Sequence, residues 1–147
     1  MDLYEAANAD RLLRDRIVER GSDGSLETEL KLCFVENSPD LLPEFPYLIA
    51  DEWDVVPGQM NHGRGDLVLT DGLGRYAVVE VKYIIGGGGG GSSHRVREGR
   101  RLKRRKVEQQ ALRYADDLPR RYPDAVEVRA YVWTNEDRLR RVDAPAQ

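Results

Sequence analysis

Three charged side chains border or interrupt the apolar runs within residues 63–83: Asp66, Glu80 and Lys82. Asp66 precedes the apolar run Leu67–Leu69, and Glu80 and Lys82 interrupt a β-branched segment. Because successive residues of a strand point to opposite faces, Glu80 and Lys82 share one face, roughly 6–7 Å apart along the strand. Burial of such charges is costly unless they are paired or bind a metal. The pattern therefore indicates either a salt bridge on a half-exposed strand or a cation site.

The two carboxylates are expected to meet at one end of a β-hairpin. Asp71-Gly72 and Gly74 supply turn residues between the two strands. Antiparallel pairing would then bring Asp66 to the same end of the sheet as Glu80. Two carboxylates beside a lysine suit a hard divalent cation, because Mg²⁺ takes oxygen ligands and keeps several waters for chemistry. Mn²⁺ is the expected substitute.

Gly65-Asp66, followed after the hairpin by Glu80-Val81-Lys82, resembles the signature of the PD-(D/E)xK nuclease superfamily, with Gly65 where the nominal motif has proline. The resemblance covers about residues 25–133 and implies metal-dependent cleavage of phosphodiester bonds. It implies that Asp66 and Glu80 are metal ligands and that the backbone carbonyl of Val81 is a further ligand. Lys82 would orient or activate the attacking water and stabilise the developing charge.

A second motif lies on the next expected helix, from about Arg97 to Leu118. Gln110 and Tyr114 are four residues apart, so they project together from one face. The run resembles the Gln-x-x-x-Tyr motif of RecB-like and lambda-exonuclease-like members of the superfamily, in which the pair supports the active site. This implies that Gln110 orients Lys82 or a phosphate and that Tyr114 hydrogen-bonds Gln110.

The resemblance also implies a glutamate that approaches the metal from the first core helix, expected from about Leu26 to Glu36. Glu29 is the choice for this role and Glu27 the reserve. Both are also first-turn acids that would favour the helix dipole, and that alternative stays open.

Basic residues are concentrated in the segment 95–106, where only Glu98 is acidic, so its net charge is +7 although the whole chain carries −3. A basic stripe on an acidic body is typical of a phosphate-binding surface, here for nucleic acid, with DNA favoured over RNA. A solvated helix face or a localisation signal would also explain it. We call this set the basic stripe: Arg95, Arg97, Arg100, Arg101, Lys103, Arg104, Arg105 and Lys106.

Length and composition predict one domain, residues 1–147, with a modest core. Cys33 is the only cysteine, which excludes an intramolecular disulfide and a cysteine-based zinc site and fits a reducing, intracellular setting. No apolar run is long enough to span a bilayer and the N-terminus lacks a signal-peptide core, so no membrane partner is expected. The resemblance implies an α/β fold, a restriction-endonuclease-like core with a central mixed sheet of four or five strands flanked by helices.

The remaining segments have simpler expectations. An N-terminal helix spans residues 1–21 and precedes a core over residues 25–134. Within that core we expect a loop at 37–57 containing strand candidates 47–50 and 53–56, a polar approach at 59–64, a flexible Gly/Ser linker at 86–93 and a strand at 125–134. The tail, 135–147, is expected to be a short helix that frays into disorder.

Together these observations predict a Mg²⁺-dependent nuclease that acts on DNA. The alternatives are a non-catalytic nucleic-acid-binding or assembly module of the same fold and an endoribonuclease. Small nucleases of this type often form dimers or parts of larger complexes, so a second copy or a larger assembly is a candidate partner.

Overall fold

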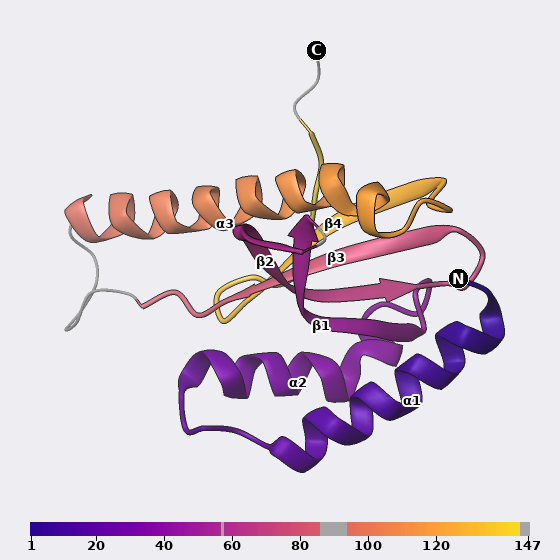
Figure 1. Ribbon diagram of the computed structural model, residues 1–147. Coiled ribbons are helices and arrows are strands. Elements are labelled where there is room, and N and C mark those ends of the chain that lie inside the picture. The colour runs from indigo at the N-terminus through magenta and orange to yellow at the C-terminus, as the bar shows by residue number, and fades with distance from the viewer. Residues whose placement is uncertain (57, 86–93, 145–147) are drawn as a thin grey trace.

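A five-stranded mixed sheet lies between two layers of helices in the computed structural model, which gives the α/β architecture expected from the sequence (Figure 1). The structure describes residues 1–56, 58–85 and 94–144, without the side chains of 56 and 59–62. The helices are α1 (Leu3–Arg20), α2 (Leu26–Leu41) and α3 (His94–Arg121); the strands are β1 (Tyr47–Val56), β2 (Gln59–Thr70), β3 (Arg75–Lys82), β4 (Glu127–Thr134) and β5 (Arg138–Val142).

The strands follow each other across the sheet in chain order, β1-β2-β3-β4-β5. All neighbours are antiparallel except β3 and β4, which are parallel and are joined through α3. Helices α1 and α2 cover one face, below the sheet in Figure 1, and α3 covers the other. The central strand β3 therefore has both faces covered, and six of its eight residues are buried.

Two apolar cores form on the two faces of the sheet, because β2 and β3 are apolar at consecutive positions. Leu67, Val79 and Trp133 pack with Phe34 of α2 on the α1/α2 face. Val68, Val78 and Trp53 pack with Tyr114 and Leu118 of α3 on the opposite face. Trp53, Tyr131 and Trp133 are all buried in these cores.

Side-chain caps fix the beginnings of the first two helices. The Asp2 carboxylate accepts a hydrogen bond from the Glu5 N–H and caps α1, and the Ser25 hydroxyl accepts one from the Thr28 N–H and caps α2. Gly21 ends α1 with φ of +67°, a conformation that glycine adopts without strain. Leu26, the first residue of α2, is 53% exposed.

Helix α2 continues to Leu41, so the expected loop from residue 37 is wrong over its first five residues. Pro39 lies inside the helix and cannot donate to the carbonyl of Val35. Arg14 of α1 donates to that carbonyl from its guanidinium, and also to the Ser38 hydroxyl at 2.8 Å. The neighbouring helix thus satisfies the acceptor that the proline leaves open.

Three further boundaries differ from expectation. Residues 59–64 belong to β2, where Gln59 pairs with Val56, and are not a separate approach segment. The tail forms β5 and not a helix, because Leu139 packs against the α1/α2-side core and pairs with Trp133 of β4. Helix α3 passes Pro119 and ends at Arg121. The expected linker, 86–93, lies outside the described residues.

No helix among the described residues is long and apolar enough to cross a membrane.

Candidate functional site

The carboxylates of Asp66 and Glu80 lie side by side on adjacent strands. The register that pairs Leu67 with Val79 places Asp66 opposite Glu80, one residue further along. The Asp66 N–H donates to Glu80 Oε2 at 2.8 Å, and the Val81 N–H donates to Asp66 Oδ2 at 2.8 Å. Each carboxylate is therefore held by the backbone of the strand that carries the other, so neither can swing away without losing a hydrogen bond.

Both carboxyl groups hold protons more tightly than carboxyls in water. Glu80 is only 2% exposed, and burial together with the negative charge of Asp66 raises its pKa well above the usual range. Burial also raises the pKa of Asp66, against the stabilising hydrogen bond from Val81. A buried and a partly buried carboxyl, side by side and both with raised pKa, indicate a place where a cation would be favourable.

The donor set at this pair fits Mg²⁺. Asp66 Oδ1 and Glu80 Oε1 receive no hydrogen bond from any described residue and are left for a ligand. No cluster of three or more histidine, cysteine, aspartate or glutamate side chains occurs in the described part of the chain. The described residues therefore do not form a metal site in which protein side chains supply every ligand. Mg²⁺ does not need such a site, because it is commonly bound through one or two carboxylates, with waters and substrate oxygens completing its coordination shell.

Of the two candidate glutamates in α2, the structure places Glu27 at this end of the sheet and not Glu29. Glu27 Oε1 lies 3.9 Å from Lys82 Nζ and accepts a hydrogen bond from the Tyr83 N–H at 3.3 Å. Glu29 is exposed and makes no such contact among the described residues. The reason is helical spacing: Glu27 stands three residues before the buried Leu30, so it shares the sheet-facing side, and Glu29 does not.

Lys82 is the last residue of β3 and its side chain is 48% exposed. An open hollow of about 500 Å³ lies beside it, between the end of β3 and α3. Its lining combines three lysines with polar and apolar groups: Lys82, Tyr83, Ile85, Lys103, Lys106, Val107 and Gln110. Asp66 and Glu80 are not among the residues that line it.

Gln110 and Tyr114 contact each other, as the resemblance implies. Gln110 Nε2 donates to the Tyr114 hydroxyl at 2.7 Å. The Tyr114 ring is 2% exposed and packs edge-on to Trp53, with centroids 6.3 Å apart. A Cβ added at Gly63 would lie 2.7 Å from the Tyr114 hydroxyl. Tyr114 therefore supports the part of β2 that leads to Asp66, while Gln110 reaches the hollow beside Lys82.

A lysine that the sequence analysis missed acts on the carboxylate pair. Lys31 of α2 forms an ion pair with Asp51 of β1, and its positive charge partly offsets the rise that burial causes in the pKa of both Asp66 and Glu80. The sequence does contain a signal, because Lys31 stands four residues after Glu27 and thus on the same side of α2. Its partner Asp51 could be identified only from the tertiary structure.

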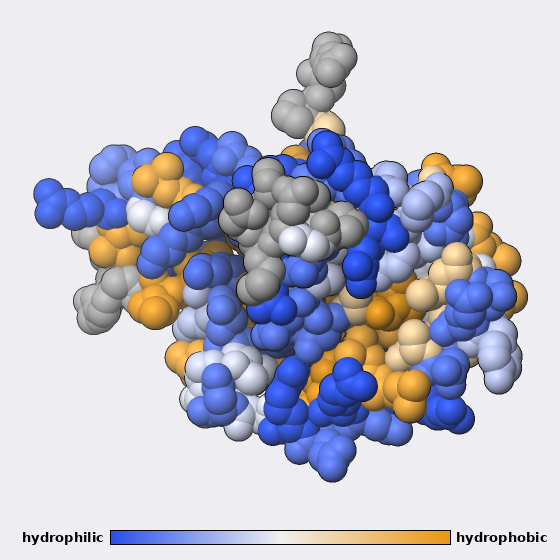
Figure 2. All heavy atoms as spheres, in the orientation of Figure 1, coloured by the Kyte–Doolittle hydropathy of each residue, from blue (hydrophilic) through white to orange (hydrophobic). Residues whose placement is uncertain are grey.

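The basic stripe divides into two sets on α3. Arg100 and Arg104 lie 3.8 Å and 3.4 Å from the carboxylate oxygens of Glu136, in the turn between β4 and β5. Arg101 pairs with Glu98 at 3.4 Å. Hydrophilic residues gather over this end of α3, at the upper left of Figure 2. The other members have no ion pair with an acid in the described residues: Arg95, Arg97, Lys103, Arg105 and Lys106.

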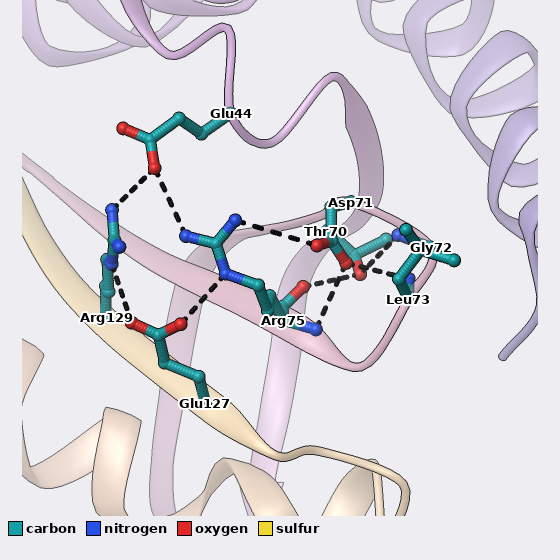
Figure 3. Close-up of polar contacts among 8 residues, drawn as sticks. All are labelled: Glu44, Thr70, Asp71, Gly72, Leu73, Arg75, Glu127 and Arg129. Atoms are coloured by element: carbon teal, nitrogen blue, oxygen red, sulfur yellow. Dashed lines mark hydrogen bonds and ion pairs between the residues drawn. The ribbon is translucent and has the colours of Figure 1, made fainter.

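The opposite end of β3 carries a charge cluster of a different kind. Arg75 contacts Glu127 at 2.8 Å and Glu44 at 3.1 Å, and Arg129 contacts the same two glutamates at 3.0 Å and 2.8 Å (Figure 3). Both guanidinium groups also lie over the ring of Phe45. Each charge there faces an opposite charge, so this cluster stabilises the sheet and leaves no side chain available for a ligand. The Asp66–Glu80 pair has no such balance.

The chain was compared with family models, with curated proteins and with solved structures. No family model matches it, and no curated protein and no solved structure matches it either.

Proposed function

We propose that this protein is a Mg²⁺-dependent nuclease that hydrolyses phosphodiester bonds, in DNA rather than RNA, on a restriction-endonuclease-like core. One observation carries this function: the carboxylates of Asp66, which is partly buried, and Glu80, which is buried, are held together by backbone hydrogen bonds two residues before Lys82. The resemblance of these residues to the PD-(D/E)xK signature supports the same conclusion. The expected metal is Mg²⁺, with Mn²⁺ as a substitute.

The charges account for the chemistry. Attack on a phosphodiester is slow because the nucleophile approaches an anion and the leaving oxygen gains charge. Mg²⁺ bound by Asp66 and Glu80 would neutralise that charge and lower the pKa of a bound water. Lys82 adds a fixed positive charge and a proton donor beside the attacking oxygen. The exposed cations of the basic stripe hold the nucleic acid by its phosphates, independently of base sequence.

The first test is the substitution Lys82→Ala. Plasmid and single-stranded DNA are incubated with the protein in Mg²⁺, Mn²⁺ or EDTA, and cleavage is followed on gels. We expect cleavage that needs the divalent cation, and a loss of about 10²–10³-fold in rate in Lys82→Ala, the usual effect of removing one group that stabilises developing charge. Stability should change by less than about 1 kcal/mol, because Lys82 is half-exposed and its ion pair is at the surface.

Arg16→Ala is the matched control, since Arg16 is an exposed cation on α1, on the far side of the sheet. Its cleavage rate should equal that of the unmodified protein. Unchanged cleavage in Lys82→Ala would reject this mechanism. Cleavage of RNA without cleavage of DNA would instead identify an endoribonuclease.

A non-catalytic nucleic-acid-binding or assembly module is the second candidate. It is favoured by the unpaired members of the basic stripe, whose charges attract phosphates with or without a metal. DNA binding without cleavage in any divalent cation, unaffected by Asp66→Asn, would establish this function in place of the nuclease.

A further inference from the structure

Two hollows adjoin the short segment 83–85 that follows Lys82. The first, of about 500 Å³, is the hollow lined by Lys82, Lys103, Lys106 and Gln110. The second, of about 560 Å³, is lined by Leu26 of α2, Arg100 of α3, Asn135 and the acidic Glu136. Tyr83 and Ile85 line both. The two hollows therefore adjoin along one segment, with a tyrosine and an isoleucine between them.

The segment presents apolar surface where most neighbours are charged. Ile85 is 65% exposed and Leu26 is 53% exposed, and Tyr83 is half-buried. A single exposed apolar residue needs no explanation. An aromatic ring and aliphatic side chains bordering a lysine-lined hollow are a different case, since this is the composition of sites where unpaired bases stack and the backbone runs past cations.

The distribution of ion pairs favours the Lys82 side of α3 for the phosphates. Glu136 and Asp137 lie near Arg100 and Arg104 and neutralise them in part. Lys103 and Lys106 have no acidic partner in the described residues, and both line the hollow that holds Lys82. The uncompensated positive charge of this part of α3 therefore points at the end of β3.

We propose that the two hollows form one groove for a single-stranded stretch of nucleic acid, with phosphates on Lys103 and Lys106 and unpaired bases against Tyr83 and Ile85. The inference rests on the proposed nuclease function, because it assigns the substrate class of the site that contains Lys82. In a duplex the base faces are covered by their neighbours, so Tyr83 and Ile85 would have nothing to stack on. A strand with unstacked bases uses both halves of the groove.

Binding is measured in EDTA, so that cleavage cannot occur, by fluorescence anisotropy of labelled oligonucleotides about 12 nucleotides long. A single DNA strand, the same sequence in RNA and a blunt DNA duplex are compared. We expect the single strands to bind at least about tenfold more tightly than the duplex. Tyr83→Ala should weaken single-strand binding about tenfold, and Tyr83→Phe, which keeps the ring, should retain it.

The double variant Lys103→Ala/Lys106→Ala tests the phosphate half of the groove. Loss of two phosphate contacts should reduce the slope of log K against log salt concentration by about 1.4 for a single strand. Arg11→Ala/Arg16→Ala removes the same charge from α1, across the sheet, and should leave the slope unchanged. Circular dichroism confirms that each variant is folded.

Equal affinity for single strands and duplex, or unchanged single-strand binding in Tyr83→Ala, would refute the proposed groove. These outcomes are separate from failure of the nuclease function. A protein that binds single strands in EDTA with the expected variant effects, yet cleaves nothing in Mg²⁺ or Mn²⁺, would refute catalysis and support the groove. A protein that cleaves duplexes but binds single strands and duplexes equally well would refute the groove and support catalysis.

Discussion

At the scale of single residues, Glu80 stands out among the described residues as a buried carboxyl. It is 2% exposed, faces a second carboxyl, and has one backbone N–H as its hydrogen-bond donor. The cation whose charge acts on it is Lys31, which itself forms an ion pair with Asp51. Folding therefore raises the pKa of Glu80, so the folded protein binds this proton more tightly than the unfolded chain does.

The pH dependence of stability should show this directly. Burial raises the pKa of Glu80 in the folded protein, whereas the pKa of a glutamate in the unfolded chain is about 4.3. Between those two pKa values the folded state binds more protons than the unfolded state, so the contribution of Glu80 to stability falls as the pH rises through that window. Glu80→Gln should therefore be more stable than the unmodified protein at neutral pH in EDTA. The advantage should vanish below about pH 4.

Thermal unfolding followed by circular dichroism at both pH values measures the effect, and each 1 kcal/mol corresponds to about 2–4 °C in Tm. Glu36→Gln, an exposed position on α2, is the matched control and should show no gain at either pH. An equal gain in Tm for Glu80→Gln at neutral and acidic pH would show that folding does not raise the pKa of Glu80.

At the scale of elements, β2 reaches the site through two glycines that lie against aromatic rings. A Cβ at Gly65 would be 2.2 Å from Trp53 Nε1, and one at Gly63 would be 2.7 Å from the Tyr114 hydroxyl. The backbone just before Asp66 is thus placed by close contact with β1 and α3. Glycine is needed there for space, which gives Gly65 a role independent of any metal.

Gly65→Ala should destabilise the protein by about 1–3 kcal/mol, because Trp53 must move or the strand must shift. Gly99→Ala is the contrasting substitution: Gly99 lies inside α3 with nothing near its added Cβ, so it should stabilise by about 0.5–1 kcal/mol. Urea unfolding of the two variants gives both values. A neutral Gly65→Ala would mean that the tryptophan ring is free to relax.

Much of this element-scale arrangement could be predicted from the sequence. The hairpin of β2 and β3 follows from its apolar runs and from the turn at Asp71-Gly72, and the spacing of Gln110 and Tyr114 gives their mutual contact. These signals are local. What failed depends on partners distant in sequence: α2 passes Pro39 because Arg14 satisfies the Val35 carbonyl, and the tail becomes a strand because Leu139 packs on the core. Lys31 was missed because Asp51 is far from it in the chain.

At the scale of the whole molecule, the two helical layers share one strand. Alternate residues of strand β3 contribute to the two cores. Removal of either helical layer would therefore expose apolar side chains of this one strand. The two tryptophans report on the two sides: Trp133 belongs to the core under α1 and α2, and Trp53 to the core under α3. We therefore expect one cooperative unfolding transition, as is usual for a domain of this size.

Two single-tryptophan variants, Trp53→Phe and Trp133→Phe, test this cooperativity. In each variant the urea midpoint from fluorescence should equal the midpoint from far-UV circular dichroism, because both cores are lost together. Trp133→Phe should be the less stable of the two, since it loses the hydrogen bond from Trp133 Nε1 to the Leu30 carbonyl, worth about 1–3 kcal/mol when an acceptor is left buried. Trp53 Nε1 has no such partner in the described residues. Midpoints that differ within one variant would show that the layers unfold separately.

The parallel pairing of β3 with β4 has a consequence for how the chain folds. Strands β1, β2 and β3 are consecutive antiparallel neighbours, whereas Val78 meets Ala130 only after all of α3 has been made. Contacts between sequence-distant segments form late because closing the intervening loop costs entropy. During synthesis, β3, which carries Glu80 and Lys82, would therefore remain an unpaired edge strand until β4 is made. Unpaired edge strands can form hydrogen bonds with a strand of another nascent chain. Prompt docking of β4 both completes the sheet and protects the chain from aggregation.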